Sequence, residues 1–360
     1  MGDSAPIRVR AKGTEPRIDA DVHCVAPDTN ALEPYLPRHW QEFVGFGGFK
    51  FREAIDHCFP PLLVGSAHLG SIDSVRQEVL EDASVMHAVL NCYMGIEALQ
   101  NVDLARSLAT ASNEWIADRW LSRGAGGSKL KASIIVAAQD PEAAGEEIRK
   151  RGSHAQSTGF VQVLLPVHSE QLYGQKHYFP IFEAASEFDL PIAIHYGGLT
   201  VNPPTPSGWP TYFIDEYVGM SQLFQSQLLS LIAEGVFERF PTLRIVLIES
   251  GFTWLPSLMW RLDKEWKGFR REVPWLKELP STYIRQHVRA TVQPIDGPMD
   301  GGPSLRVVFD QIGSAGFLMY GSDYPHSQGT QREMDAFLDV LSAEEKQMIL
   351  LGNAKELYRL

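Results

Sequence analysis

The sequence predicts a (β/α)₈ barrel, a closed ring of eight parallel strands in which each strand is followed by a helix. Eight short runs of apolar and β-branched residues alternate with segments whose apolar residues recur at helical spacing. Such alternation indicates a parallel sheet, and eight units are the number that closes a barrel. The rival is an open doubly wound sheet, but no Gly-x-Gly-x-x-Gly follows any predicted strand, which removes its commonest cofactor signature.

The predicted strands are brief apolar runs, as expected for strands that are buried on both faces. The first lies within Arg17–Pro27 and ends at His23. The others are residues 85–90, 131–137, 160–165, 192–195, 243–249, 288–293 and 317–321.

Helices are predicted where apolar residues recur every three or four positions. Asp140 is the expected N-cap of one helix, and Gly235 is expected to stop another. The predicted helices are residues 74–80, 98–123, 141–150, 181–187, 220–234, 255–266, 304–312, 331–341 and 344–358.

Residues 17–360 are expected to form one domain, preceded by an N-terminal extension, 1–16. Residues 28–80 are irregular and rich in Pro, Gly and aromatic side chains. Loops of this length usually have a function, so we expect a lid at the barrel mouth, although a flap packed for stability or for a subunit contact fits equally well. A second mouth-side loop is expected at Gly197–Phe213, stiffened by four prolines.

Composition and charge narrow the classes of partner. The formal net charge of −12 and the lack of a Lys/Arg-rich run argue against nucleic-acid binding. No apolar run approaches twenty residues and no signal-peptide pattern begins the chain, so no membrane partner is expected. Cys24, Cys58 and Cys92 follow neither a metal-binding nor a disulfide spacing. These features predict a cytoplasmic protein with reduced thiols that acts on a small molecule.

Ionisable side chains follow the predicted strands at the end where barrels carry their chemistry. Together they supply three imidazoles and three carboxylates: Asp21, His23, His195, Glu249, Asp323 and His326. So many ionisable groups in one cleft would be costly without a compensating cation. Nitrogen and oxygen ligands without thiolate suit zinc, manganese or iron, and the number of ligands suffices for one or two ions per chain.

The weaker candidates are open to more than one interpretation. Glu249 could bind a second ion, orient a ligand or pair with an arginine, and His326 could instead bind substrate or cap a loop. Asn91 ends strand two and Gln293 ends strand seven, so both are candidate substrate contacts. Asp19 lies one layer below Asp21, where a hydrogen-bonded structural role is expected.

Three motifs together resemble the amidohydrolase superfamily: Asp-Val-His on strand one, Ile-His-Tyr-Gly-Gly at strand five and Ser-Asp-Tyr-Pro-His at strand eight. Within it the chain resembles the amidohydrolase-related branch that includes non-oxidative aromatic-acid decarboxylases. The resemblance runs from about Ile18 to the C-terminus. It implies that His23 and His195 are metal ligands, and that Asp323 is an acid/base that also touches the metal or its water.

The chain departs from the hydrolase pattern at two positions. Asp21 stands in place of the first His of His-x-His, and Glu249 stands where strand six often carries His. Both changes make the site richer in carboxylates, which favours iron or manganese over zinc. The expected activity is hydrolysis or non-oxidative decarboxylation of a small carboxylate-bearing molecule, with an aromatic acid as the narrower alternative, and Asp323, His326 and Glu249 are the expected catalytic residues.

Two other functions stay open. A dinuclear non-heme iron (or Fe/Mn) monooxygenase could use the same barrel, and Glu249 and His326 would then both be direct ligands. A structural or regulatory subunit would not explain a retained set of ligands. Members of this branch commonly associate, so a homo-oligomer or a pairing with a related subunit is expected, and the lid aromatics offer an apolar patch for it.

Overall fold

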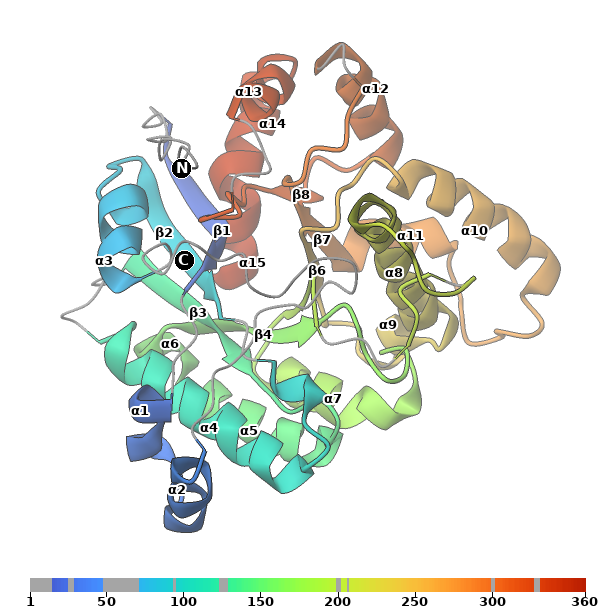
Figure 1. The fold of residues 1–360 in the computed structure, drawn as a ribbon. Coiled ribbons are helices and arrows are strands. Elements are labelled where there is room, and N and C mark those ends of the chain that lie inside the picture. The colour runs from blue at the N-terminus through green and yellow to red at the C-terminus, as the bar shows by residue number, and fades with distance from the viewer. Residues whose placement is uncertain are drawn as a thin grey trace.

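The computed structural model describes residues 15–24, 29–47, 71–92, 95–122, 129–198, 202–205, 207–298, 302–326 and 331–360. Eight parallel strands follow one another around a single sheet in chain order (Figure 1). They are β1 Arg17–His23, β2 Val85–Asn91, β3 Leu130–Ile135, β4 Phe160–Pro166, β5 Ile192–His195, β6 Ile245–Ile248, β7 Val288–Thr291 and β8 Leu318–Met319.

Backbone contacts between the first and last strands close the ring. Ala20 N–H donates to the Tyr320 carbonyl over 2.9 Å, and His23 N–H donates to the Tyr324 carbonyl over 2.7 Å. Val22 and Tyr324 also form a parallel bridge. The prediction of a (β/α)₈ barrel is therefore confirmed.

Helices surround the strands on the outside of the ring (Figure 1). Those that follow strands are α4 Val102–Arg119, α5 Pro141–Gly152, α7 Phe179–Glu187, α8 Phe213–Ala233, α10 Leu255–Phe269, α12 Gly302–Ile312 and α13 Gln331–Asp339. The shorter helices are α1 Thr29–Leu32, η1 Glu33–Tyr35, α2 Arg38–Gly45, α3 Ile72–Val75, η2 Arg76–Leu80, η3 Ile96–Ala98, α6 Ala155–Thr158, η5 Lys176–Tyr178, α9 Val236–Arg239, α11 Pro280–His287, α14 Ala343–Gln347, η6 Met348–Gly352 and α15 Asn353–Tyr358.

Most predicted elements occur within a few residues of their expected positions. The Asp140 side chain accepts a hydrogen bond from Ala143 N–H, as an N-cap should. Two differences stand out. Helix α8 begins at Phe213, well before the expected start at Met220, and α11 was not predicted because its eight residues are too few to show a clear period.

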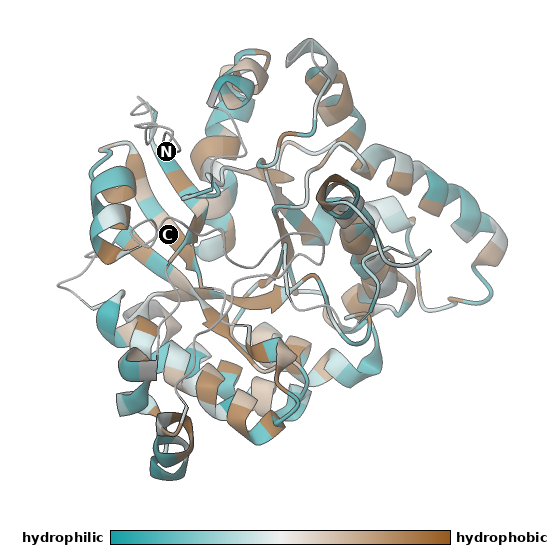
Figure 2. Cartoon of the chain, viewed as in Figure 1, coloured by the Kyte–Doolittle hydropathy of each residue, from teal (hydrophilic) through white to brown (hydrophobic). Residues whose placement is uncertain are grey.

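The main core lies between the strands and the surrounding helices. Fully buried side chains such as Val22, Leu90 and Val163 on the strands belong to the same apolar cluster as Ile116 on α4 and Phe182 on α7. Hydropathy follows this arrangement, because the central strands are mostly apolar and the outer faces of the helices are mostly polar (Figure 2).

The segment expected to form a lid, 28–80, lies partly outside the described residues, which omit residue 28 and residues 48–70. In its described part, α1 and η1 pack against α4. Tyr35 donates a hydrogen bond to Asp118 on that helix over 2.6 Å. Helix α2 lies beside them, outside the ring of strands (Figure 1).

The expectation that all cysteines are reduced is wrong for two of them. Cys24 and Cys92 form a disulfide, with their Cα atoms 5.4 Å apart. The pairing is remote in sequence but follows from the fold, because His23 pairs with Asn91 where the neighbouring strands β1 and β2 end. Among the described residues, no helix is both long and apolar enough to cross a membrane.

Candidate metal centre

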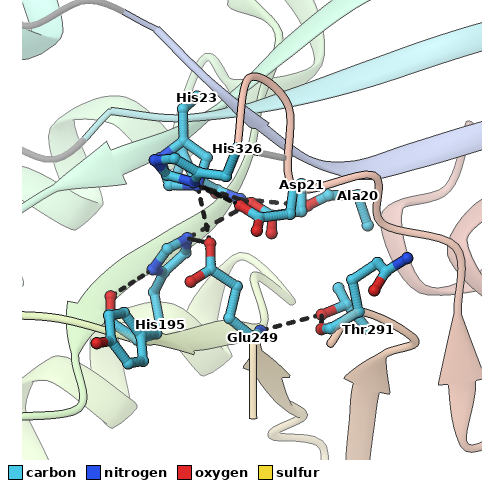
Figure 3. Close-up of polar contacts among 12 residues, drawn as sticks. Ala20, Asp21, His23, His195, Glu249, Thr291 and His326 are labelled. Carbon is cyan, nitrogen blue, oxygen red and sulfur yellow. Dashed lines mark hydrogen bonds and ion pairs between the residues drawn. The ribbon is translucent and has the colours of Figure 1, made fainter. Parts of the chain in front are cut away.

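Six ionisable side chains meet where four strands of the barrel end. Asp21 and His23 lie on β1 and His195 ends β5, while Glu249 follows β6 and the pair Asp323 and His326 follows β8. Figure 3 shows that His23, His195, Glu249 and His326 turn toward one another from separate strands. The structure therefore brings all six predicted ligands to one place.

The first group of possible ligands is deeply buried. It comprises Asp21, His23, His195 and Glu249, whose ligand atoms all lie within 4.8 Å of one another. His195 Nε2 is 3.4 Å from Asp21 Oδ1 and 3.5 Å from Glu249 Oε1. His195 Nδ1 lies 2.7 Å from the carbonyl of Tyr196 and donates to it, which directs the Nε2 lone pair to the cluster.

The second group shares two members with the first. It comprises His23, Glu249, Asp323 and His326, again within 4.8 Å. His23 Nε2 lies 2.9 Å from Glu249 Oε1 and 3.4 Å from Asp323 Oδ1. His326 Nδ1 lies 2.7 Å from Asp323 Oδ1, and its side chain is the most exposed of the six at 40%. His23 and Glu249 thus connect a buried group with a more open one.

The backbone is strained at two of these residues. Glu249 has a φ of 58° and Asp323 a φ of 53°, in the left-handed region that side chains other than Gly and Asn rarely adopt. Such strain costs about 1–3 kcal/mol and tends to occur at functional sites. In both residues it occurs just beyond a strand end, where a carboxylate is turned into the mouth of the barrel.

Neighbouring carboxylates keep the site histidines protonatable. Burial alone would lower the pKa of His23, but hydrogen bonds with Asp323 and Glu249 outweigh it and raise the pKa well above its ordinary value. Burial would also lower the pKa of His195, but the negative charges of Glu249 and Asp21 outweigh this effect, so the pKa is raised as well. These carboxylates would stabilise a metal cation at the same nitrogen atoms for the same electrostatic reason.

The two carboxylates nearest the open side differ in acidity. Burial, together with the charge of Asp323, raises the pKa of Glu249 to about 7. Burial would also raise the pKa of Asp323, but hydrogen bonds with His23 and His326 prevail and lower it. The pair therefore carries one proton preferentially on Glu249, as expected for like charges that share one site.

The two predicted substrate contacts lie in different surroundings. Asn91 is fully buried, and its side-chain N–H group donates to Asp21 Oδ1 over 2.9 Å, while its role as a substrate contact stays a prediction. Gln293 is 6% exposed, and its Oε1 has no hydrogen-bond partner among the residues that the structure describes. Gln293 stays a candidate for substrate binding.

Several supporting residues were not predicted. Thr291 Oγ1 on β7 accepts the backbone N–H of Glu249 over 3.1 Å, which helps to hold the strained residue (Figure 3). Gly321 allows a close approach, since a Cβ there would lie 2.9 Å from Thr291 Cβ and 3.1 Å from Asp21 Cβ. The predicted structural role of Asp19 agrees with its hydrogen bonds from Ser322 N–H (2.8 Å) and Asp21 N–H (3.3 Å).

The residues present fit a divalent metal ion. Asp21 is fully buried, and its Oδ2 has no hydrogen-bond partner within the described chain, which would be costly for a carboxylate oxygen unless it binds a cation. Each of the two groups offers two imidazoles and two carboxylates, with no thiolate, and such a set of donors suits manganese, iron or zinc.

Comparison with known proteins identifies similar sequences. The model of the amidohydrolase family matches residues 66–360. A gamma-resorcylate decarboxylase of Polaromonas sp. is 22% identical over 318 residues, which cover 82% of this chain and 89% of that protein. A second gamma-resorcylate decarboxylase, from Rhodococcus jostii, is 24% identical over 209 residues, covering 55% of this chain and 61% of the relative.

Solved structures share the fold at low sequence identity. An amidohydrolase of Mycobacterium avium subsp. paratuberculosis aligns with a TM-score of 0.74 and 19% identity, covering 96% of this chain and 100% of that one. The 5-carboxyvanillate decarboxylase of Novosphingobium aromaticivorans, complexed with manganese and 4-hydroxy-3-methoxy-5-nitrobenzoic acid, aligns with a TM-score of 0.70 and 20% identity, covering 98% and 99% of the two chains.

Proposed function

The chain belongs to the amidohydrolase family, and on that premise we propose that it is a metal-dependent, non-oxidative decarboxylase of an aromatic carboxylate. The observation that carries the proposal is the pair of overlapping ligand groups at the mouth of the barrel, Asp21, His23, His195 and Glu249 in one and His23, Glu249, Asp323 and His326 in the other. The similarity to curated decarboxylases over most of the chain supports decarboxylation in preference to hydrolysis.

We propose manganese as the metal, with iron as the nearest alternative. The carboxylate-rich donor set favours hard ions over zinc. The related decarboxylases of Polaromonas sp. and N. aromaticivorans were both solved with manganese bound. Asp21, His23, His195 and Asp323 would hold the ion, which when bound polarises the carboxylate or a neighbouring oxygen of the substrate.

Decarboxylation of an aromatic acid requires a proton at the ring carbon that loses CO₂. Asp323 and His326 share a hydrogen bond of 2.7 Å at the open side of the cluster. Burial would lower the pKa of His326, but this hydrogen bond outweighs burial, so the pKa is raised. We therefore assign the proton to this pair: His326 holds it, and Asp323 accepts it across their hydrogen bond and passes it to the ring carbon. Glu249, whose burial raises its pKa to about 7, can hold a second proton near neutral pH.

The direct test is turnover of aromatic acids by protein loaded with Mn²⁺. 2,6-Dihydroxybenzoate and 5-carboxyvanillate should be tried first, and loss of the carboxylate followed by chromatography and by CO₂ release. We expect the same rate with and without oxygen, and Asp323→Asn should lose at least 100-fold in kcat, because a positioned proton donor contributes about 10²–10⁴-fold. Cleavage of esters or amides, with no decarboxylation of any aromatic acid, would contradict the proposal.

A second candidate is favoured by one specific observation. Glu249 belongs to both groups of possible ligands and His326 to the second, so the site offers two overlapping sets of four ligands, as a dinuclear centre would require. The alternative is a dinuclear iron (or Fe/Mn) monooxygenase. Two ions per chain by elemental analysis, together with product formation that stops without oxygen, would favour it over decarboxylation.

We also propose that the protein associates, as a homo-oligomer or with a related subunit. Large apolar side chains are exposed around the start of α8: Trp209, Tyr212, Ile214 and Val218. The regions expected to cover the mouth, 28–80 and Gly197–Phe213, also stay proposals. Sedimentation velocity tests the association, and a strict monomer at micromolar concentration would refute it.

A further inference from the structure

A chain of buried hydrogen bonds runs from the C-terminal helix α15 to the Asp21 carboxylate. Tyr358 Oη donates to Gln162 Oε1 over 2.8 Å. Gln162 Nε2 donates to Asn91 Oδ1 over 3.1 Å, and Asn91 Nδ2 donates to Asp21 Oδ1 over 2.9 Å. Ser133 braces the middle of the chain, because its Oγ donates to Asn91 Oδ1 over 2.7 Å and accepts from Gln162 Nε2 over 2.9 Å.

These side chains come from α15 and from three neighbouring strands, β4, β3 and β2, and they contact one another across the interior of the ring. Asn91 and Gln162 are fully buried, Ser133 is 1% exposed and Tyr358 is 6% exposed. Polar groups so deep in a barrel need full pairing, and their pairing gives the network a fixed arrangement.

The direction of the hydrogen bonds is determined at the metal end. Asn91 Nδ2 faces two acceptors, Asp21 Oδ1 and the Ala20 carbonyl at 3.2 Å, so its amide can be placed in only one way. Its Oδ1 consequently receives from Ser133 and Gln162. Every donor therefore points toward the Asp21 carboxylate, and hydrogen bonds aligned in series reinforce one another.

We propose that Asn91, Ser133, Gln162 and Tyr358, here called the Asn91 network, are positioning residues that set the metal affinity of the site through Asp21. Asn91 holds Oδ1, the carboxylate oxygen that lies 3.4 Å from His195 Nε2, and so fixes the orientation in which Asp21 faces the other candidate ligands. Groups that orient a ligand in this way typically change metal affinity 10- to 100-fold when they are removed. Because Tyr358 is the last residue of α15, the C-terminal helix also takes part in setting the metal affinity.

An electrostatic observation agrees with the connection. Burial, and after it the negative charge of Asp21, raises the pKa of the Tyr358 hydroxyl. The charge at the metal site is thus felt by the side chain at the far end of the network. The inference needs metal binding at Asp21, but it does not depend on which reaction the site performs.

The test measures Mn²⁺ affinity in protein stripped with chelator, by the electron paramagnetic resonance signal of free Mn²⁺. We expect Asn91→Ala to weaken binding about 10- to 100-fold. Tyr358→Phe should weaken it about fivefold, the equivalent of one hydrogen bond. In the Asn91→Ala background, Tyr358→Phe should have no further effect, because its influence passes through Asn91.

The matched control is Tyr283→Phe. Tyr283 is 4% exposed, and its hydroxyl accepts hydrogen bonds from the backbone N–H groups of Lys277 (2.9 Å) and Glu278 (3.1 Å). It should lower the melting temperature without changing Mn²⁺ affinity. Unchanged affinity in Tyr358→Phe would overturn the proposal, as would an undiminished effect in the double variant. If Asn91→Ala does not fold, Gln162→Leu replaces it in the cycle, because Tyr358 contacts the network through Gln162.

Discussion

His195 is a candidate metal ligand whose orientation the protein fixes. It is 1% exposed, and its Nδ1 is committed to the Tyr196 carbonyl. We predict that His195→Ala lowers Mn²⁺ affinity at least about 100-fold, more than the loss of a supporting residue does. Elemental analysis of protein purified without chelator measures the effect. His177→Ala, at an exposed histidine, should keep the wild-type metal content.

Protonation of the site makes stability depend on pH. Burial raises the pKa of Glu249 to about 7, so the folded protein binds a proton there that the unfolded chain releases above about 4.5. Hydrogen bonds to carboxylates, against the opposing effect of burial, raise the pKa of His23 and His326. The contribution of these two histidines to the free energy of unfolding is complete below about pH 6.5, and it is lost as pH rises through their folded-state pKa.

All these groups thus favour the folded state at lower pH within this window. In chelator, we predict that the free energy of unfolding in urea falls as pH rises from about 5.5 to 8. Glu249→Gln should flatten this dependence, because the amide does not titrate. Burial would raise the pKa of Asp323, but its hydrogen bonds lower it. Asp323 therefore changes stability in the opposite sense, and only at much lower pH. A wild-type stability that increases over the same range would contradict the assignment.

At the scale of elements, the packing of β8 against β1 and β7 depends on a missing side chain. A Cβ at Gly321 would lie 2.9 Å from Thr291 Cβ and 3.1 Å from Asp21 Cβ, both on rigid strands. We predict that Gly321→Ala costs about 1–3 kcal/mol of stability, as overpacking does, and weakens metal binding by displacing Asp21. Urea unfolding and Mn²⁺ titration test the two effects.

The control for this prediction is Gly268→Ala on α10. A Cβ at Gly268 would meet nothing within 4 Å, and the residue is helical. Alanine there should stabilise by about 0.5–1 kcal/mol, because Gly is a poor helix former. If both substitutions change the free energy of unfolding equally, the close packing around Gly321 is not the cause of the effect.

The strand elements could be predicted because each is a short apolar run, and β5 was placed at its observed residues. The meeting of the six candidate ligands at one place could be predicted because polar residues at strand ends are conspicuous after apolar runs, and their roles as ligands stay predictions. The Asn91 network could not, since its partners are far apart in sequence and pair only when the ring closes. Polar Ser133 and Gln162 inside apolar strands were the one available signal. The start of α8 was missed because Phe213–Tyr217 lacks a regular apolar period.

For the whole molecule, a bound metal ion should stabilise the closed barrel. Its candidate ligands come from β1, β5 and the segments after β6 and β8, so a bound ion would connect opposite sides of the ring. We predict that Mn²⁺ at one hundred times its Kd stabilises the fold by about 2.7 kcal/mol, which raises the melting temperature by several degrees. The shift should disappear in His195→Ala, and a shift of equal size in that variant would place the ion elsewhere.

The Cys24–Cys92 disulfide turns the segment between β1 and β2 into a covalent loop. A protease that cuts the chain once anywhere from residue 25 to residue 91 therefore cannot release either fragment. Such a nicked molecule should migrate as one intact band on a denaturing gel and separate into two only after a reductant is added. The first strand, with Asp21 and His23, would stay covalently attached to the rest of the barrel through the disulfide after the chain has been cut.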